Sequence, residues 1–268
     1  MGVELWTWLR EDLGDGDRTS EAVIDPEAQC TAELFLKEPG VVCGLAVCEG
    51  VFREVDPGIA FVPSCADGDL LEPCRVARVE GNARAILAGE RLALNLLGRL
   101  SGIATLTRRY VDAVEGTDVT ILDTRKTTPG LRALEKEAVR AGGGSNHRYG
   151  LYDAILVKDN HLRVAGGIER AVMRARHAGL PVEVECETFP EVQDALAAGA
   201  DRILLDNMSP AQLRRAVACV VGAVELEASG GVTLENIRRV AETGVDYISV
   251  GALTHSAPTL DFSLEVIA

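Results

Sequence analysis

The chain has 268 residues and a formal net charge of −14, and 47% of its residues are hydrophobic. This composition is ordinary for a globular protein, and the length allows one large domain or two smaller ones. The acidic charge argues against a nucleic-acid or anionic-membrane partner, because such partners select basic surfaces. The sequence has no run of about 18 apolar residues, so we expect no transmembrane helix.

The amino terminus and the cysteines favour a cytoplasmic protein. Residues 1–6 contain neither a basic region nor a long apolar stretch, so we expect no secretion signal. The seven cysteines include no CxxC motif, which argues against a disulfide framework or a zinc site. Reduced, mostly buried thiols are typical of cytoplasmic proteins.

The first hundred residues combine short strands with helices among Pro/Gly turns. We predict a small α+β sandwich domain over residues 1–98, whose last helix leads into the next domain. Residues 258–268 are able to pack back on this domain. The expected strands span 32–37, 40–43 and 76–80, and the expected helices span 46–55 and 83–100.

From residue 119 onward, short β-branched runs alternate with Ala- and Leu-rich segments. Several of these segments stop at a glycine, the expected helix C-cap. Near-continuous apolar strands in this alternation predict parallel βαβ units. Six units are visible where a complete (β/α)8 barrel needs eight, so we predict an incomplete, open α/β barrel over residues 99–257. The expected strands span 119–124, 154–158, 182–186, 202–206, 223–228 and 247–250, and the helices 168–178, 191–198 and 234–243.

Charged residues gather where five consecutive predicted strands end. Barrel enzymes build their sites from the carboxyl ends of several strands, because the strand fixes the backbone and the following loop is free to vary. One charged residue at a strand end is usually a cap or a surface group, whereas five in succession indicate a site. The candidates are Asp123, Thr124, Arg125, Lys126, Lys158, Glu185, Asp206 and Ser229.

Positive charge is concentrated in the middle of the chain. Three of the four lysines lie between residues 125 and 158, with four arginines and only three carboxylates. This cluster suggests a small anionic ligand, and chance clustering on a solvated helix is the alternative. The loop 142–148 places His147 beside Arg148, which suits a dicarboxylate, because arginine binds carboxylates through two parallel hydrogen bonds.

Two glycine-containing turns predict a phosphate site. Ser229-Gly230-Gly231 follows the fifth strand and Gly251 follows the sixth. Glycine lets backbone N–H groups approach a phosphate, and a following helix, with its expected N-cap at Thr233, would add partial positive charge. In barrels the phosphate characteristically lies in the last two βα loops.

Glu185 and Asp206 can direct carboxylates toward one another from adjacent strand ends. Two carboxylates beside a polyphosphate suit Mg²⁺, which uses one or two carboxylates together with substrate oxygens and waters. The alternative is that they pair with Lys126 or Lys158 and act mainly through electrostatics. Both arrangements can hold together.

At these motifs the chain resembles the quinolinate phosphoribosyltransferases over nearly its whole length. The most specific stretches are Asp123-Thr-Arg-Lys-Thr-Thr-Pro-Gly-Leu-Arg132, Gly142-Gly-Gly-Ser-Asn-His-Arg148 and Lys158-Asp-Asn-His161. Leu92 stands where the family commonly has threonine, outside the charged set. Further matching stretches are 90–95, 100–105, 152–157, 182–185, 204–207, 227–231 and 250–256.

The resemblance implies an amino-terminal α/β sandwich domain packed on an open α/β barrel, with active sites shared across a homodimer that could assemble further. It implies quinolinate and phosphoribosyl pyrophosphate as substrates and Mg²⁺ as cofactor. It assigns the quinolinate carboxylates to Arg125, His147, Arg148 and Lys158, with Arg91 from the neighbouring subunit. It assigns the ribose and pyrophosphate to Lys126, Lys158, Glu185 and Asp206, which are also the catalytic set, and adds Thr124. It assigns the 5-phosphate to Ser229, Gly230, Gly231, Gly251 and His255.

The implied reaction gives nicotinate mononucleotide, pyrophosphate and CO₂ in NAD biosynthesis. An acidic pair stabilises the oxocarbenium-like ribose, and no protein nucleophile is needed. One alternative is a different phosphoribosyltransferase of the same fold, nicotinate-type or associated with molybdate transport, although such relatives lack the block Lys158–His161. A Schiff-base lyase using Lys126 or Lys158 is a second alternative, and a non-catalytic anion sensor is a third.

Overall fold

The computed structural model describes residues 5–267, and the chain divides into two compact units. The first unit runs to Leu106 and resumes at Ala257, and the second is Thr107–Ser256. Four residues of the segment considered for a secretion signal, and the last residue of the chain, lie outside the described residues. Between residues 5 and 267, no helix combines the length and the apolar character that crossing a membrane requires.

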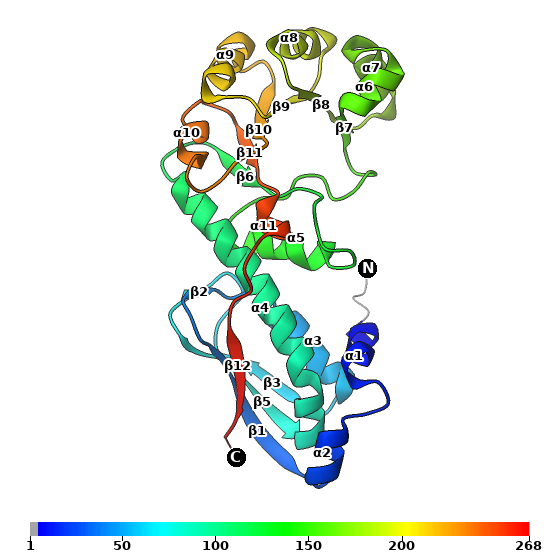
Figure 1. Ribbon diagram of the computed structural model, residues 1–268, viewed down its shortest axis with the longest axis vertical. Coiled ribbons are helices and arrows are strands. Elements are labelled where there is room, and N and C mark those ends of the chain that lie inside the picture. The colour runs from blue at the N-terminus through cyan, green and yellow to red at the C-terminus, as the bar shows by residue number, and fades with distance from the viewer. Residues whose placement is uncertain (1–4, 268) are drawn as a thin grey trace. The chain divides into compact units, whose positions relative to one another are not determined.

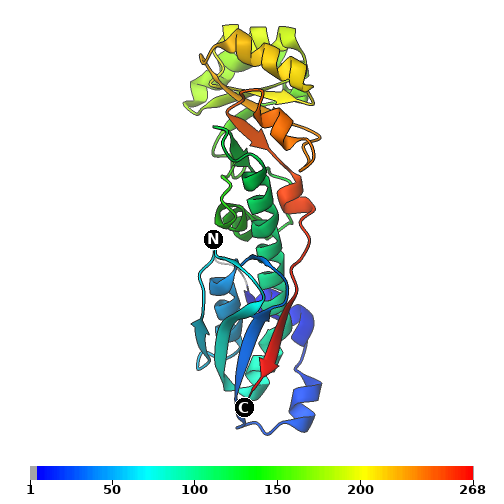
Figure 2. The ribbon, with the colours of Figure 1, turned by 90° about the vertical axis from the view of Figure 1, so that its left-hand side faces the viewer.

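The first unit contains a four-stranded antiparallel sheet in the order β12 (Phe262–Val266), β1 (Gln29–Leu36), β5 (Cys74–Asn82) and β3 (Ala60–Pro63). Burial alternates along β1, so that its even-numbered residues from Ala32 to Leu36 form an apolar inner face. The C-terminal strand β12 lies along the free edge of β1 (Figure 2). The unit also has β2 (Gly40–Val41), β4 (Leu70–Leu71), α1 (Leu5–Leu13), α2 (Arg18–Val23) and α3 (Leu45–Val55).

Helix α4 (Ala83–Ala113) is 31 residues long, whereas the sequence predicts an end at residue 100. Gly102 does not end the helix. It allows the backbone of Pro258 to pack closely against the helix, because a Cβ atom at position 102 would collide with the carbonyl oxygen of Pro258. Ile103 and Ala104 continue the buried apolar side of the helix. The predicted boundary between the domains therefore falls inside a continuous helix.

The second unit contains a six-stranded parallel sheet in the order β6-β11-β10-β9-β8-β7 (Figure 1); its strands are β6 (Thr120–Leu122), β7 (Ile155–Val157), β8 (Val182–Cys186), β9 (Arg202–Asp206), β10 (Glu225–Ser229) and β11 (Tyr247–Ser249). The edge strands β6 and β7 do not pair with each other, so the predicted open α/β barrel is confirmed. The loop 142–148 adds one parallel bridge to the β6 edge, between Leu122 and Ser145.

Three helices, α7 (Ile168–Ala175), α8 (Phe189–Ala198) and α9 (Pro210–Val220), lie along one face of this sheet (Figure 1). Helices α8 and α9 start at capping boxes, Thr188 with Glu191 and Ser209 with Gln212, and each has a proline in its first turn. Helices α5, α6 and α9 have no counterpart among the helices expected from the sequence. The helices are α5 (Arg132–Ala141), α6 (Asp159–Ala165), α7 (Ile168–Ala175), a 3-10 turn (Arg176–Ala178), α8 (Phe189–Ala198), α9 (Pro210–Val220), α10 (Ile237–Ala241) and α11 (Ala252–His255).

Candidate active site

Two guanidinium groups lie near each other between the end of β6 and the start of β7. Burial lowers the pKa of Arg148, and the nearby charge of Arg125 lowers it further. Arg125 Nε is buried and has no hydrogen-bond partner among residues 5–267. Arg148 Nη1 donates to the carbonyl of Ala154 at 3.2 Å. Two adjacent cations with donors to spare can bind a dianion.

A buried ion pair holds the loop that carries Arg148. Lys136 Nζ lies 2.5 Å from Asp123 Oδ1, with side chains 1% and 0% exposed. The carboxylate of Asp123 also accepts hydrogen bonds from Asn146 Nδ2 at 2.6 Å and from the backbone N–H of His147 at 2.9 Å. Lys136 Nζ donates to the carbonyl of His147 at 3.0 Å. Burial raises the pKa of Asp123 and lowers that of Lys136, so the pair depends on these contacts to remain ionised.

The imidazole of His147 faces Glu183 on β8 and Glu227 on β10, and its side chain is 8% exposed. Its Nδ1 accepts the backbone N–H of Arg148 at 2.7 Å. Its Nε2 lies 3.1 Å from Glu183 Oε2 and 3.5 Å from Glu227 Oε2. Burial alone would lower the pKa of His147, but the two carboxylates outweigh it and raise the pKa. Nδ1 is therefore occupied by the backbone of Arg148, whereas Nε2 is buried and has no hydrogen-bond partner within residues 5–267.

Lys158 and Glu185 form an ion pair between the ends of β7 and β8. This pairing is the alternative that the sequence left open beside a magnesium site. Asp206, at the end of β9, accepts a hydrogen bond from Asn207 Nδ2 at 2.7 Å. Asn207 has a φ of 54°, a left-handed conformation that asparagine tolerates better than most residues, and its N–H donates to the carbonyl of Ser229 at 2.9 Å. These contacts tie the ends of β9 and β10 together.

Lys126 and His255 converge on Gly251. A Cβ atom on Gly251 would lie 3.2 Å from both the Lys126 Cδ and His255 Nε2 atoms, so these two side chains flank the turn after β11. Thr254 Oγ1 donates to the carbonyl of Lys126 at 2.8 Å. The backbone of Lys126 is thereby held by the same turn, and an anion bound there would meet an ammonium and an imidazole.

The expected helix start at Thr233 is wrong. Helix α10 begins at Ile237 after the cap residue Asn236, because Thr233 to Asn236 form a separate turn in which Thr233 N donates to Asn236 Oδ1 at 2.9 Å. Helix α10 has five residues and helix α11 four. Helices this short, and one that starts six residues beyond Gly231, contribute little dipole, so a phosphate here depends on backbone N–H groups and on side-chain cations.

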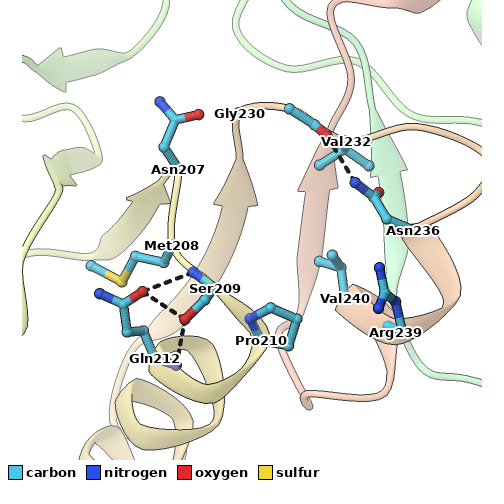
Figure 3. A pocket seen from close by; sticks show the side chains of 11 residues that line it. Asn207, Met208, Ser209, Pro210, Gln212, Gly230, Val232, Asn236, Arg239 and Val240 are labelled. Carbon is cyan, nitrogen blue, oxygen red and sulfur yellow. Dashed lines mark hydrogen bonds between the residues drawn. The ribbon is translucent and has the colours of Figure 1, made fainter.

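A cavity of about 380 Å³ adjoins the turn after β10. Figure 3 shows Asn207 and Ser209 on one side and Asn236 and Arg239 on the other, with Gly230 between them. Gly230 has a φ of 88°, and a Cβ there would collide with the Asn207 amide oxygen. Of the predicted phosphate residues, Gly230 and Gly231 line this cavity.

Two further candidates lie apart from these contacts. Thr124 Oγ1 accepts the backbone N–H of Lys126 at 3.1 Å, so it shapes the turn after β6. Arg91 is exposed on α4 in the first unit.

Sequence reasoning missed the buried residues Lys136, Glu183 and Glu227. A signal was present, because Val182-Glu-Val-Glu-Cys186 and Glu225-Leu-Glu-Ala-Ser229 alternate charged with apolar residues. A strand that is covered on both faces normally consists of consecutive apolar residues. A charged residue at every second position therefore indicates that one face of the strand contributes to a polar site.

The oxygen donors of Glu185 and Asp206 fit Mg²⁺, which prefers carboxylates and retains waters. Their strands β8 and β9 are neighbours in the sheet, paired from Glu183–Arg202 to Cys186–Leu205. Glu185 is 12% exposed and is shared with Lys158, which leaves oxygen positions for a substrate-bound cation.

Comparison with known proteins identifies the family. Two family models match, described as quinolinate phosphoribosyl transferase, N-terminal domain, over residues 17–101 and C-terminal domain over residues 103–265. A probable nicotinate-nucleotide pyrophosphorylase [carboxylating] of Bacillus subtilis is 46% identical over 260 residues, which cover 96% of this chain and 90% of that relative. A relative of the same description from Synechocystis is 43% identical over 270 residues, 98% of this chain and 91% of that relative.

Solved structures agree with the sequence relatives. NadC from Streptococcus pyogenes is 42% identical, with a TM-score of 0.94 over 98% of this chain and 96% of that one. The nicotinate-nucleotide pyrophosphorylase from Francisella tularensis is 39% identical, with a TM-score of 0.95 over 98% of this chain and 94% of that one. Both domain models, these relatives and the open parallel sheet lead to one conclusion: the chain belongs to the quinolinate phosphoribosyltransferase family.

Proposed function

We propose that this protein transfers the ribose 5-phosphate of phosphoribosyl pyrophosphate to quinolinate, giving nicotinate mononucleotide, pyrophosphate and CO₂ in NAD biosynthesis. Family membership over both domains supports this activity. The observation that carries it is the pair Arg125 and Arg148, two adjacent guanidinium groups with a buried, unsatisfied Nε on Arg125. Such a pair suits a ligand with two neighbouring carboxylates better than one with a single charge.

The proposed binding roles follow the charges. Arg125, His147, Arg148 and Lys158 hold the quinolinate carboxylates. Lys126, Lys158, Glu185 and Asp206 surround the ribose and pyrophosphate. The 5-phosphate is held by His255 and the turn residues Ser229, Gly230, Gly231 and Gly251. Thr124 shapes the turn that presents Lys126.

In the proposed reaction, the pyridine nitrogen attacks C1 of the ribose while the bond from C1 to the pyrophosphate oxygen breaks and the leaving group takes the bonding electrons. Glu185 and Asp206 stabilise the positive charge that develops on the ribose, and Lys126 and Lys158 balance the leaving group. Positioning by the carboxylate clamp supplies much of the rate, since the nitrogen is a weak nucleophile. The ring nitrogen is then cationic, so the adjacent carboxylate leaves as CO₂ and its ring carbon takes up a proton.

Glu185 and Asp206 would hold Mg²⁺, partly through substrate and water. Bound there, the ion neutralises charge on the pyrophosphate.

The test is an assay of the purified chain with phosphoribosyl pyrophosphate, Mg²⁺ and either quinolinate or nicotinate. We expect nicotinate mononucleotide and CO₂ from quinolinate only, with activity lost in EDTA and restored by excess Mg²⁺. Product from nicotinate alone, or no product from a folded protein, would contradict the proposal. Full activity in EDTA would remove the metal from it.

We also propose a homodimer with shared sites, in which Arg91 of the partner subunit reaches quinolinate. Its exposure on α4 supports this role. An inactive Arg91→Ala protein mixed with an inactive Lys158→Ala protein should regain activity, because one site of each hybrid is intact. Absence of rescue after demonstrated subunit exchange would exclude shared sites.

We propose a cytoplasmic location, because the seven cysteines form no disulfide within residues 5–267.

A further inference from the structure

A buried layer of titratable side chains lies beneath the proposed substrate site. It consists of His147, Glu183 and Glu227, whose side chains are 8%, 9% and 0% exposed. Residues two apart on a strand point to the same face, so Glu183 lies one step below Glu185, and Glu227 one step below Ser229, each roughly 7 Å away. The layer therefore supports the strand ends that carry the proposed substrate contacts.

His147 connects this layer to the backbone of Arg148. A neutral imidazole has one donor and one acceptor nitrogen. Nδ1 accepts the N–H of Arg148 at 2.7 Å, so the ring proton is on Nε2, which faces Glu183 Oε2 at 3.1 Å and Glu227 Oε2 at 3.5 Å. Nε2 is buried and has no well-aligned hydrogen-bond partner within residues 5–267, so the two carboxylates hold it through charge.

We propose that Glu183 and Glu227 are positioning residues for the reaction: they fix the His147 ring so that its Nδ1 holds the backbone of Arg148 and directs the Arg148 guanidinium at a quinolinate carboxylate. His147 is then a link between the carboxylates and Arg148. This inference rests on the proposed function.

The burial of the two carboxylates indicates a role other than stabilising the fold. Removing a carboxylate from water is costly, and well-packed apolar residues in such places are often as stabilising or more so. Both oxygens of Glu227 and Oε1 of Glu183 have no hydrogen-bond partner within residues 5–267. Their nearest cationic neighbours are His147 and Arg202, whose Nη1 lies 3.6 Å from Glu227 Oε2. Of these oxygens, Glu227 Oε2 faces the ring that holds Arg148, at 3.5 Å from Nε2.

The same three side chains could be considered as ligands for a metal ion, since one ligand atom from each lies within 4.8 Å of the others. The tautomer of His147 opposes this assignment. A metal-bound histidine normally donates its second ring N–H to a neighbour, whereas Nδ1 of His147 accepts one. A metal would also have to displace the proton from Nε2 and lie close to the Arg202 cation.

The experiment is a double-mutant cycle between Glu227 and Arg148. Glu227→Gln keeps the shape of the side chain and removes the carboxylate. We expect a rise of roughly tenfold in KM for quinolinate, with kcat and KM for phosphoribosyl pyrophosphate within about twofold, because only the aim of Arg148 changes. In an Arg148→Lys background, Glu227→Gln should change kcat/KM for quinolinate by less than about twofold, because positioning acts through Arg148.

Glu225→Gln is the matched control, since Glu225 lies on the same strand and contacts Arg202 and Tyr247. It should leave all kinetic constants unchanged. Additive effects of Glu227→Gln and Arg148→Lys, or an unchanged KM for quinolinate in Glu227→Gln, would overturn the proposal. If Glu227→Gln does not fold, Glu183→Gln replaces it in the same cycle.

Metal analysis of protein purified without chelator closes the test. We expect well under one equivalent of any transition metal, and a stoichiometric metal that is lost in Glu227→Gln would overturn the positioning role. The wild type is assayed beside the variants. No product from the wild type refutes the proposed function, whereas an active wild type with an unaltered Glu227→Gln variant refutes the positioning role alone.

Discussion

The two sheets of this protein use their inner faces differently. In the first unit, β1 turns Ala32, Leu34 and Leu36 inward and leaves its charge outside, where Glu33 pairs with the half-exposed Arg75 at 2.6 Å. In the second unit, β8 and β10 bury the carboxylates of Glu183 and Glu227.

The difference teaches where this protein tolerates an energetic cost. An apolar inner face stabilises the first unit through burial alone. Buried charge in the second unit is costly, and it occurs next to the groups that we assign to the substrate. Buried charge in the parallel sheet therefore points to the site.

The largest effect on the free energy of unfolding is expected at the buried ion pair that holds the loop 142–148. Lys136→Met leaves Asp123 charged and 0% exposed, with hydrogen bonds from Asn146 and His147 but without its cation. We expect a loss of about 3–5 kcal/mol in the free energy of unfolding, measured by urea denaturation. The double variant Lys136→Met with Asp123→Asn should recover part of this loss. A single variant as stable as the wild type would show that the pair contributes nothing.

The next largest effect is expected on quinolinate binding in the second unit. Arg148→Ala removes a guanidinium that we assign to a quinolinate carboxylate, and each charge-assisted hydrogen bond is worth about 1.5–3 kcal/mol. We expect kcat/KM for quinolinate to fall roughly 100- to 1,000-fold, with the melting temperature little changed. Arg214→Ala, at an exposed position on α9, is the control and should be fully active. Unchanged affinity in Arg148→Ala would remove Arg148 from the clamp.

The titration of Glu227 should be visible in the free energy of unfolding as a function of pH. Burial, and then the charge of Glu183, raise the pKa of Glu227 from 4.5 to about 7. Because the folded pKa is raised, the contribution of this group is fully present below about pH 4.5 and is lost as the pH rises through about 7. The Glu227→Gln side chain cannot ionise. The free energy of unfolding of this variant should therefore rise relative to that of the wild type over this pH range, by on the order of 2 kcal/mol. Parallel pH profiles would show that Glu227 has an ordinary pKa.

The smallest effect is expected at an exposed pair of the first unit. Lys37 Nζ lies 3.5 Å from Glu265 Oε1, and their side chains are 45% and 53% exposed. Water and salt screen such a pair, so Lys37→Ala should change the free energy of unfolding by less than about 1 kcal/mol. A loss as large as that of Lys136→Met would break the distinction between buried and exposed pairs.

The sequence by itself determined the strands of the second unit and their order along the chain. The strands β8 and β9 match the predicted ranges at both ends, because short β-branched runs that follow a helix-ending glycine have few alternative structures. The glycine turns after β10 and β11 and the charged strand ends were also visible, since parallel strands bring their carboxyl ends to one edge.

Only the tertiary structure decided which charges meet. Asp123 and Lys136 are 13 residues apart, and the ring of His147 lies against Glu183 and Glu227, on strands 36 and 80 residues further along the chain. Periodicity reports the face on which a residue lies, but not its partner across a sheet. The continuation of α4 through Gly102 has the same cause: the carbonyl of Pro258 that excludes a side chain there comes from the far end of the chain.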